Sequence, residues 1–76
     1  MNAQIKNAWN TMSTPSDVLS LEKFEKVCEL VDATPAKIAD FIDGGENGWE
    51  NTDEHNAWLK KDSPDAIASW VSAGMI

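Results

Sequence analysis

Each of the three prolines in this 76-residue chain directly follows a hydroxyl residue, a pattern that marks where helices begin. A Ser or Thr oxygen just before a helix accepts an otherwise unpaired backbone N–H, and proline at the first helical position has no N–H to leave unpaired. The three dipeptides are Thr14-Pro15, Thr34-Pro35 and Ser63-Pro64. They predict helix starts near residues 15, 35 and 64, and Thr52 followed by two acids predicts a fourth.

Apolar residues recur at helical spacing along the chain, and no segment alternates as a strand would. The predicted helices span about 3–12, 18–32, 35–43, 53–61 and 64–73. Gly74 follows the last helix as a favourable residue beyond its C-terminus, and residues 43–52 form the one real loop. We therefore expect a single all-α domain over residues 1–76, a small bundle of four to five short helices.

The charge balance is strongly acidic, and it narrows the choice of partners. Thirteen acids stand against six lysines, which gives a net charge of −7, and arginine is absent. Such a chain repels phosphate backbones and anionic membrane surfaces, and it lacks the residue that most often reads guanine.

The chain carries neither a signal-peptide pattern nor an apolar run long enough to cross a membrane. Cys28 is the only cysteine, so no internal disulfide can form and we expect a cytoplasmic location.

Residues 24–43, FEKVCELVDATPAKIADFID, resemble a helix-turn-helix unit of phage and bacterial regulators. That motif has apolar residues at its fourth, eighth, tenth, fifteenth and eighteenth positions and a small residue at its fifth, which pack its two helices across a tight turn. These positions hold Val27, Cys28, Val31, Ala33, Ile38 and Phe41. The resemblance implies a helix-turn-helix-like pair in the middle of the bundle.

The same segment departs from the motif at its turn and in its second helix. Asp32 replaces the usual glycine of the turn. The second helix offers Lys37, Asp40 and Asp43, and no Arg, Asn or Gln to read bases. The resemblance therefore supports the local fold more than DNA binding, and two helices packed around a Thr-Pro turn would account for the same residues.

Residues 43–54, DGGENGWENTDE, resemble a degenerate EF-hand loop between two helices. Its ligand positions and sharp bend would be supplied by Asp43, Asn47, Gly48, Asn51 and Glu54. Gly45 stands where an oxygen ligand belongs, and Glu50 where an apolar residue normally joins the core. We favour the alternative of a polar connecting loop, and expect neither a metal ion nor another cofactor.

No catalytic residue can be named. Cys28 and His55 are the only soft metal ligands, too few for a closed zinc site. We expect Cys28 to be a small core residue and His55 to be a solvated surface residue. The tryptophans at 9, 58 and 70 lie on apolar helical faces and are expected to pack in the core. Trp49 lies in the acidic loop, where it either folds back onto the core or projects as an anchor for a partner.

These features point to a non-enzymatic interaction protein, such as an inhibitor or DNA mimic, that presents an acidic surface to a basic patch on a nucleic-acid-handling partner. The comparison with small phage inhibitors rests on size and charge alone. The expected partner-binding residues are Asp43, Glu46, Trp49, Glu50, Asp53 and Glu54. A helix-turn-helix transcriptional regulator, acting as a dimer, is the alternative, and a calcium-binding EF-hand-like module is the third hypothesis.

Overall fold

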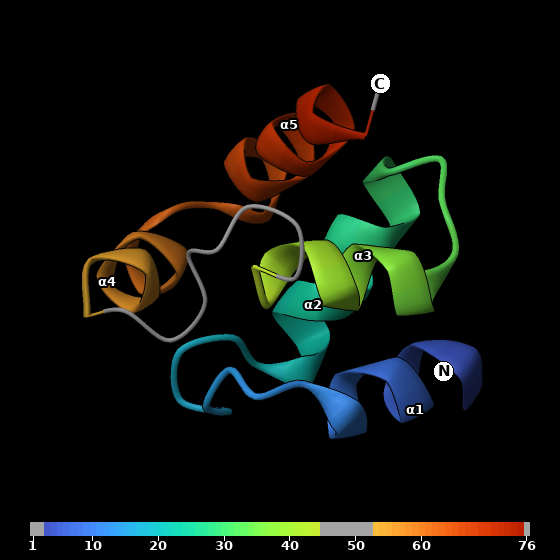
Figure 1. The fold of residues 1–76 in the computed structure, drawn as a ribbon, viewed down its shortest axis with the longest axis horizontal. Helices are drawn as coiled ribbons and strands as arrows, with labels where there is room; N and C mark the ends of the chain where they lie inside the picture. Colours follow the sequence, from blue (N-terminus) through green and yellow to red (C-terminus); the bar gives the residue numbers. More distant parts are fainter. Residues whose placement is uncertain (1–2, 45–52, 76) are drawn as a thin grey trace.

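The computed structural model describes residues 3–44 and 53–75, which form five α-helices and no strand. The helices are α1 (Ala3–Thr11), α2 (Leu21–Leu30), α3 (Pro35–Ile42), α4 (Asp53–Lys61) and α5 (Pro64–Gly74). Figure 1 shows them as a small bundle, with α4 on one side of α3 and the end of α5 above the turn that joins α2 to α3. The predicted all-α bundle is confirmed.

Three of the helices begin at a hydroxyl residue that caps them. The hydroxyl oxygens of Ser20, Thr34 and Ser63 each accept the backbone N–H three residues further on, at 3.2 to 3.3 Å. Proline occupies the first turn of α3 and of α5, as the sequence predicts. The starts predicted near residues 35 and 64 are therefore confirmed, and for the reason given, since the cap satisfies one of the unpaired N–H groups of each helix.

The helix start predicted near residue 15 is wrong. After Pro15 the chain makes a single turn, in which the N–H groups of Val18 and Leu19 both donate to the Pro15 carbonyl, at 3.0 and 3.1 Å. The helix begins only at Leu21. The Thr14 hydroxyl does not cap a helix, because it donates to the carboxylate of Asp43 at 2.7 Å.

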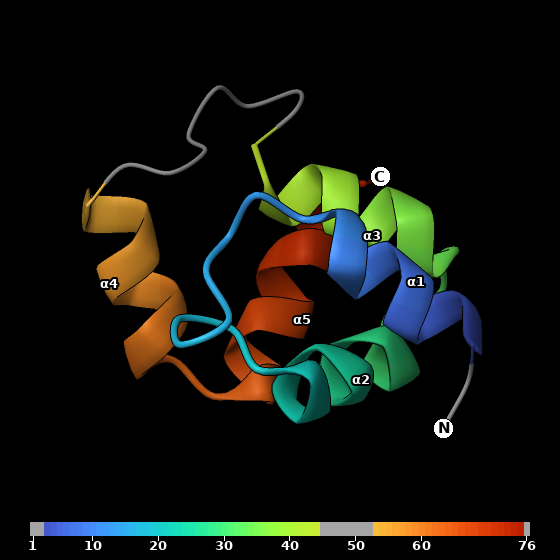
Figure 2. The same cartoon turned by 90° about the horizontal axis from the view of Figure 1, so that it is seen from below.

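The core is built from the inner faces of the helices, with α2 packed mainly against α5 and α3 mainly against α1. Figure 2 shows α1 beside α3 and α2 beside α5. The fully buried side chains include Leu19, Phe24, Val27, Ile38, Ile42, Leu59, Ile67 and Val71. The three described tryptophans and Cys28 are half-buried and pack against this core, as expected. None of the described helices is long and apolar enough to span a membrane.

The expectation that His55 is a solvated surface residue is wrong, because its side chain is 0% exposed. Its Nε2 lies 2.7 Å from the carbonyl oxygen of Ile42, in the last turn of α3. In the tautomer with the proton on Nε2, the ring donates to a carbonyl that the helix itself leaves unpaired. The His55 side of the first turn of α4 thus faces inward, toward the end of α3.

Candidate interaction surface

An aromatic cluster joins α3, α4 and α5. Its members are Phe41, His55, Trp58 and Trp70. The Trp58 and Trp70 rings meet edge to face with centroids 5.0 Å apart, and Phe41 tilts against Trp70 at 4.7 Å. Such edge-to-face and tilted pairs are favourable arrangements of aromatic quadrupoles. The cluster fixes the direction in which Phe41 leaves α3.

Phe41 also lies directly on Gly74, near the end of α5. A Cβ atom placed on Gly74 would lie 2.1 Å from Cζ and 2.6 Å from Cε2 of Phe41. Real side chains do not approach so closely, so only glycine allows the ring to lie here. Gly74 is the last residue of α5, with Met75 as its C-cap, whereas we expected Gly74 to follow the helix.

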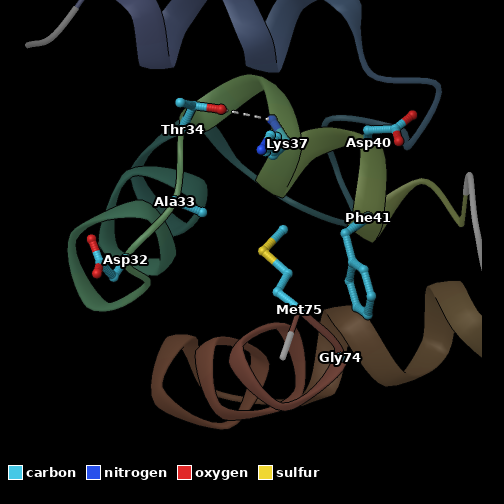
Figure 3. A pocket seen from close by; sticks show the side chains of 8 residues that line it. All are labelled: Asp32, Ala33, Thr34, Lys37, Asp40, Phe41, Gly74 and Met75. Atoms are coloured by element: carbon cyan, nitrogen blue, oxygen red, sulfur yellow. Dashed lines mark hydrogen bonds between the residues drawn. The ribbon is translucent and has the colours of Figure 1, made fainter.

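A groove of about 690 Å³ opens beside this contact, between the 31–34 turn, α3 and the end of α5. Figure 3 shows Phe41 pointing from α3 toward α5 and Met75 extending from α5 toward α3. The half-buried side chains of Ala33, Phe41 and Met75 give the groove an apolar part. The exposed side chains of Asp32, Lys37 and Asp40 also line it. The surface thus combines an apolar recess with two carboxylates and one ammonium.

A second, smaller groove of about 440 Å³ lies between the end of α2 and the outer side of α5. It is lined by Leu30, Asp65, Ala68, Ser69 and Ser72. Among the described residues, Leu30 is the large hydrophobic side chain that stands exposed, at 54%. Single exposed apolar residues are common on protein surfaces and need no partner.

The expected partner-binding residues fall into three groups. Asp53 and Glu54 are exposed in the first turn of α4, where acids also favour the helix dipole. Glu46, Trp49 and Glu50 lie outside the described residues, as do the loop positions 45, 47, 48 and 51 of the EF-hand resemblance.

Asp43, the sixth of these residues, is engaged within the fold. Its Oδ2 accepts the N–H of Ser13 at 2.9 Å, and its Oδ1 accepts both the N–H and the hydroxyl of Thr14, at 3.2 and 2.7 Å. These contacts join the end of α3 to a segment about thirty residues earlier in the chain. Asp43 thus holds the fold together, whether or not it also meets a partner.

The residues of the helix-turn-helix resemblance lie mostly inward. Val27, Val31 and Ile38 are buried, and the others at the motif's small and apolar positions are half-buried. The side of α3 open to solvent carries Ala36, Lys37 and Asp40. A helix that reads bases would present hydrogen-bond donors there, whereas this face offers one ammonium beside a carboxylate.

The outer side of α2 carries a line of acids, Glu22, Glu25 and Glu29, one helical turn apart. Burial, together with the nearby negative charges of Glu25 and Glu29, raises the pKa of the Cys28 thiol to about 11. A thiol of this kind is a poor nucleophile at neutral pH.

Lys23, on the same helix, has a structural partner. Its Nζ donates to the carbonyl oxygen of Leu59 at 2.6 Å, in the last turn of α4. Burial lowers the pKa of Lys23, and the nearby charge of Asp62 acts in the opposite direction. The ammonium thus satisfies a carbonyl that α4 leaves unpaired and joins α4 to α2.

In the described part of the chain, no three His, Cys, Asp or Glu side chains come together as a metal site would require. Comparison with known proteins gave no match: no family model fits the chain, and no curated protein and no solved structure matches it.

Proposed function

We propose that this chain is a non-enzymatic interaction protein that presents an acidic surface to a basic patch on a nucleic-acid-handling partner. The observation that supports this most is the spread of exposed carboxylates over α2, the 31–34 turn, α3, α4 and α5. Those carboxylates belong to Glu22, Glu29, Asp32, Asp40, Asp53, Glu54 and Asp65. With a net charge of −7, the chain attracts basic surfaces and repels the phosphates that such surfaces ordinarily bind.

The mechanism follows from where these charges are held. All of these carboxylates except that of Asp32 stand on helices, and capping hydroxyls and the aromatic cluster hold those helices in place, so a partner meets the charges already positioned. Charges on the rim of an interface mainly accelerate association, and they do so less at high salt. The chain would then act by occupying the basic patch and excluding nucleic acid from it, as an inhibitor or DNA mimic does.

The contact residues that we propose are Asp43, Glu46, Trp49, Glu50, Asp53 and Glu54. Asp43 differs from the others because substituting it would also disturb the fold. Asp53 and Glu54 are the better probes, since both are exposed.

The competing hypothesis is a helix-turn-helix regulator that binds DNA directly through α3. The exposed face of α3 carries the positive charge of Lys37 and, beside it, the negative charge of Asp40. Because the carboxylate of Asp40 repels DNA phosphates, this face disfavours the hypothesis.

Affinity capture from a lysate of the source organism, run beside a gel shift on random duplex DNA at low salt, separates the two hypotheses. We expect the chain to leave the DNA unshifted, and to capture a DNA- or RNA-binding protein that it displaces from its nucleic acid. The affinity should fall as salt rises. A chain that shifts DNA by itself would contradict the proposal.

Two double variants of α4 test the acidic contact. The test variant combines Asp53→Asn with Glu54→Gln, and its matched control combines Lys60→Gln with Lys61→Gln. The first pair should weaken capture of the partner, and the second should strengthen it or leave it unchanged. Equal affinity of all three proteins across a salt titration would place the interface away from α4.

A further inference from the structure

We propose that the groove between α3 and the end of α5 is the docking site for a peptide segment of the partner, in which one apolar side chain is flanked by basic residues. The inference rests on the proposed function, because it takes the partner to be basic. It adds a second contact, separate from the acidic contact residues between Asp43 and Glu54, and the chemistry by which that contact holds one segment of the partner.

The apolar part of the groove calls for an apolar side chain. At about 690 Å³, the groove is within the range of roughly 300–1,000 Å³ typical of sites that bind small ligands. Phe41 and Met75 both reach into it, from opposite sides (Figure 3). Methionine adapts its shape to what it meets, and aromatic rings supply large contact areas. A single Leu or Phe side chain entering here would bury apolar surface on both.

The charged part of the groove selects what flanks that side chain. Asp32 and Asp40 give two negative charges and Lys37 gives one positive charge, so the lining carries a net charge of −1 on a chain whose net charge is −7. A basic segment can pair with the two carboxylates, whereas an acidic segment or a phosphate backbone is repelled by them and by the rest of the chain.

The groove is formed before any partner arrives. Thr34 caps the first turn of α3, and the contact between Phe41 and Gly74 fixes the distance between α3 and α5. A site whose walls are already in place loses little conformational freedom on binding, which favours recognition of a short segment.

The test uses the full chain, labelled with ¹⁵N, and three synthetic pentapeptides titrated by NMR. The first is Arg-Arg-Phe-Arg-Arg, the second replaces Phe by Ser, and the third replaces every Arg by Glu. We expect the first peptide to bind with shifts centred on the amides of Ala33, Phe41 and Met75. The second should bind at least about tenfold more weakly, because burying an aromatic side chain changes the affinity by more than a factor of about ten. The third should not bind.

Variants of the chain then test the charges one at a time. Asp32→Asn and Asp40→Asn should each weaken binding of the first peptide about two- to fivefold, the size expected for an exposed ion pair. Glu22→Gln, an exposed acid on the outer side of α2, is the matched control and should change it less. Lys37→Gln should strengthen binding, because it removes the positive charge from the groove, whereas direct DNA binding through α3 would be weakened by the same change.

Two results would overturn the docking site. One is equal binding of the Phe and Ser peptides, with shifts spread over the acids of α2 and α4. The other is unchanged binding when Asp32 and Asp40 are both neutralised in a variant whose amide spectrum is otherwise that of the folded chain. If either is found while the captured partner still binds in a salt-dependent manner, the proposed function stands and the partner uses another surface.

Discussion

Replacing Asp43 by alanine should destabilise the chain by about 2 kcal/mol, which is large for a half-exposed polar residue. The carboxylate accepts three hydrogen bonds, at 2.9, 3.2 and 2.7 Å, from the segment between α1 and α2. These bonds close a loop of about thirty residues between the segment that follows α1 and the end of α3.

The magnitude follows from how much water can replace the lost acceptor. A hydrogen bond to a charged group contributes about 1.5–3 kcal/mol when its partner would otherwise be left unsatisfied. Ser13 is exposed, so water can take the place of the carboxylate at its N–H. Thr14 is only 9% exposed, so its N–H and hydroxyl are poorly hydrated without Asp43. The loss of about 2 kcal/mol therefore corresponds to the full contribution of about one hydrogen bond and part of the contribution of the others.

The assay is urea unfolding followed by tryptophan fluorescence and by circular dichroism. Asp40→Ala is the matched control, because Asp40 is an exposed acid of α3 three residues earlier, and it should change the free energy of unfolding by no more than about 0.5 kcal/mol. Combined with Thr14→Val in a double-mutant cycle, Asp43→Ala should show a coupling energy of about 1 kcal/mol. If Asp43→Ala costs no more than Asp40→Ala, or the cycle shows no coupling, the hydrogen bonds do not hold this segment.

Four further predictions concern other contacts. Gly74→Ala should lower the unfolding midpoint, because crowding the new methyl group against the Phe41 ring costs about 1–3 kcal/mol and outweighs the gain in helix propensity. Adding Phe41→Leu to this variant should recover part of the lost stability. Lys23→Met should destabilise by about 1 kcal/mol and Lys26→Met, at an exposed site of the same helix, by much less. Cys28, with its pKa raised from 9.0 to about 11, should be alkylated roughly a hundredfold more slowly at pH 8 than in urea-unfolded chain, and a rate equal to that of unfolded chain would show that the thiol is not protected. The thermal midpoint should be the same with millimolar calcium as with chelator, and a clear rise with calcium would favour the EF-hand hypothesis.

The sequence predicted a helix start correctly where the capping hydroxyl had no other hydrogen-bond partner in the described part of the fold. Thr34 and Ser63 cap α3 and α5 as predicted, because each hydroxyl needs only the N–H three residues away. Thr14 has the same dipeptide signature, but its hydroxyl meets the carboxylate of Asp43 instead. Ser20, which no proline follows, takes over as the cap of α2. A contact between residues far apart in sequence decided the outcome, and local pattern carries no information about it.

His55 shows the same limit for a single side chain. A histidine beside two acids at the start of a helix has the pattern of a surface residue, and the prediction treated it so. Its burial depends on a carbonyl at the end of another helix, Ile42, and on the rings of Trp58 and Trp70, which the sequence places at separate positions. By contrast, the inward packing of the tryptophans on α1, α4 and α5 could be predicted, since helical spacing alone puts each on an apolar face.

The groove lining could not have been assembled from the sequence, since it combines the 31–34 turn, α3 and the last residues of α5. The groove suits binding because α3 is held at both ends. Thr34 caps its N-terminus, while at its C-terminus Asp43 accepts hydrogen bonds from the α1–α2 segment and the Ile42 carbonyl lies against His55. A helix fixed in this way presents Lys37, Asp40 and Phe41 at constant positions, so a change in charge there alters binding without moving the fold. That separation allows Lys37→Gln to distinguish a basic peptide, whose binding it strengthens, from DNA, whose binding it weakens.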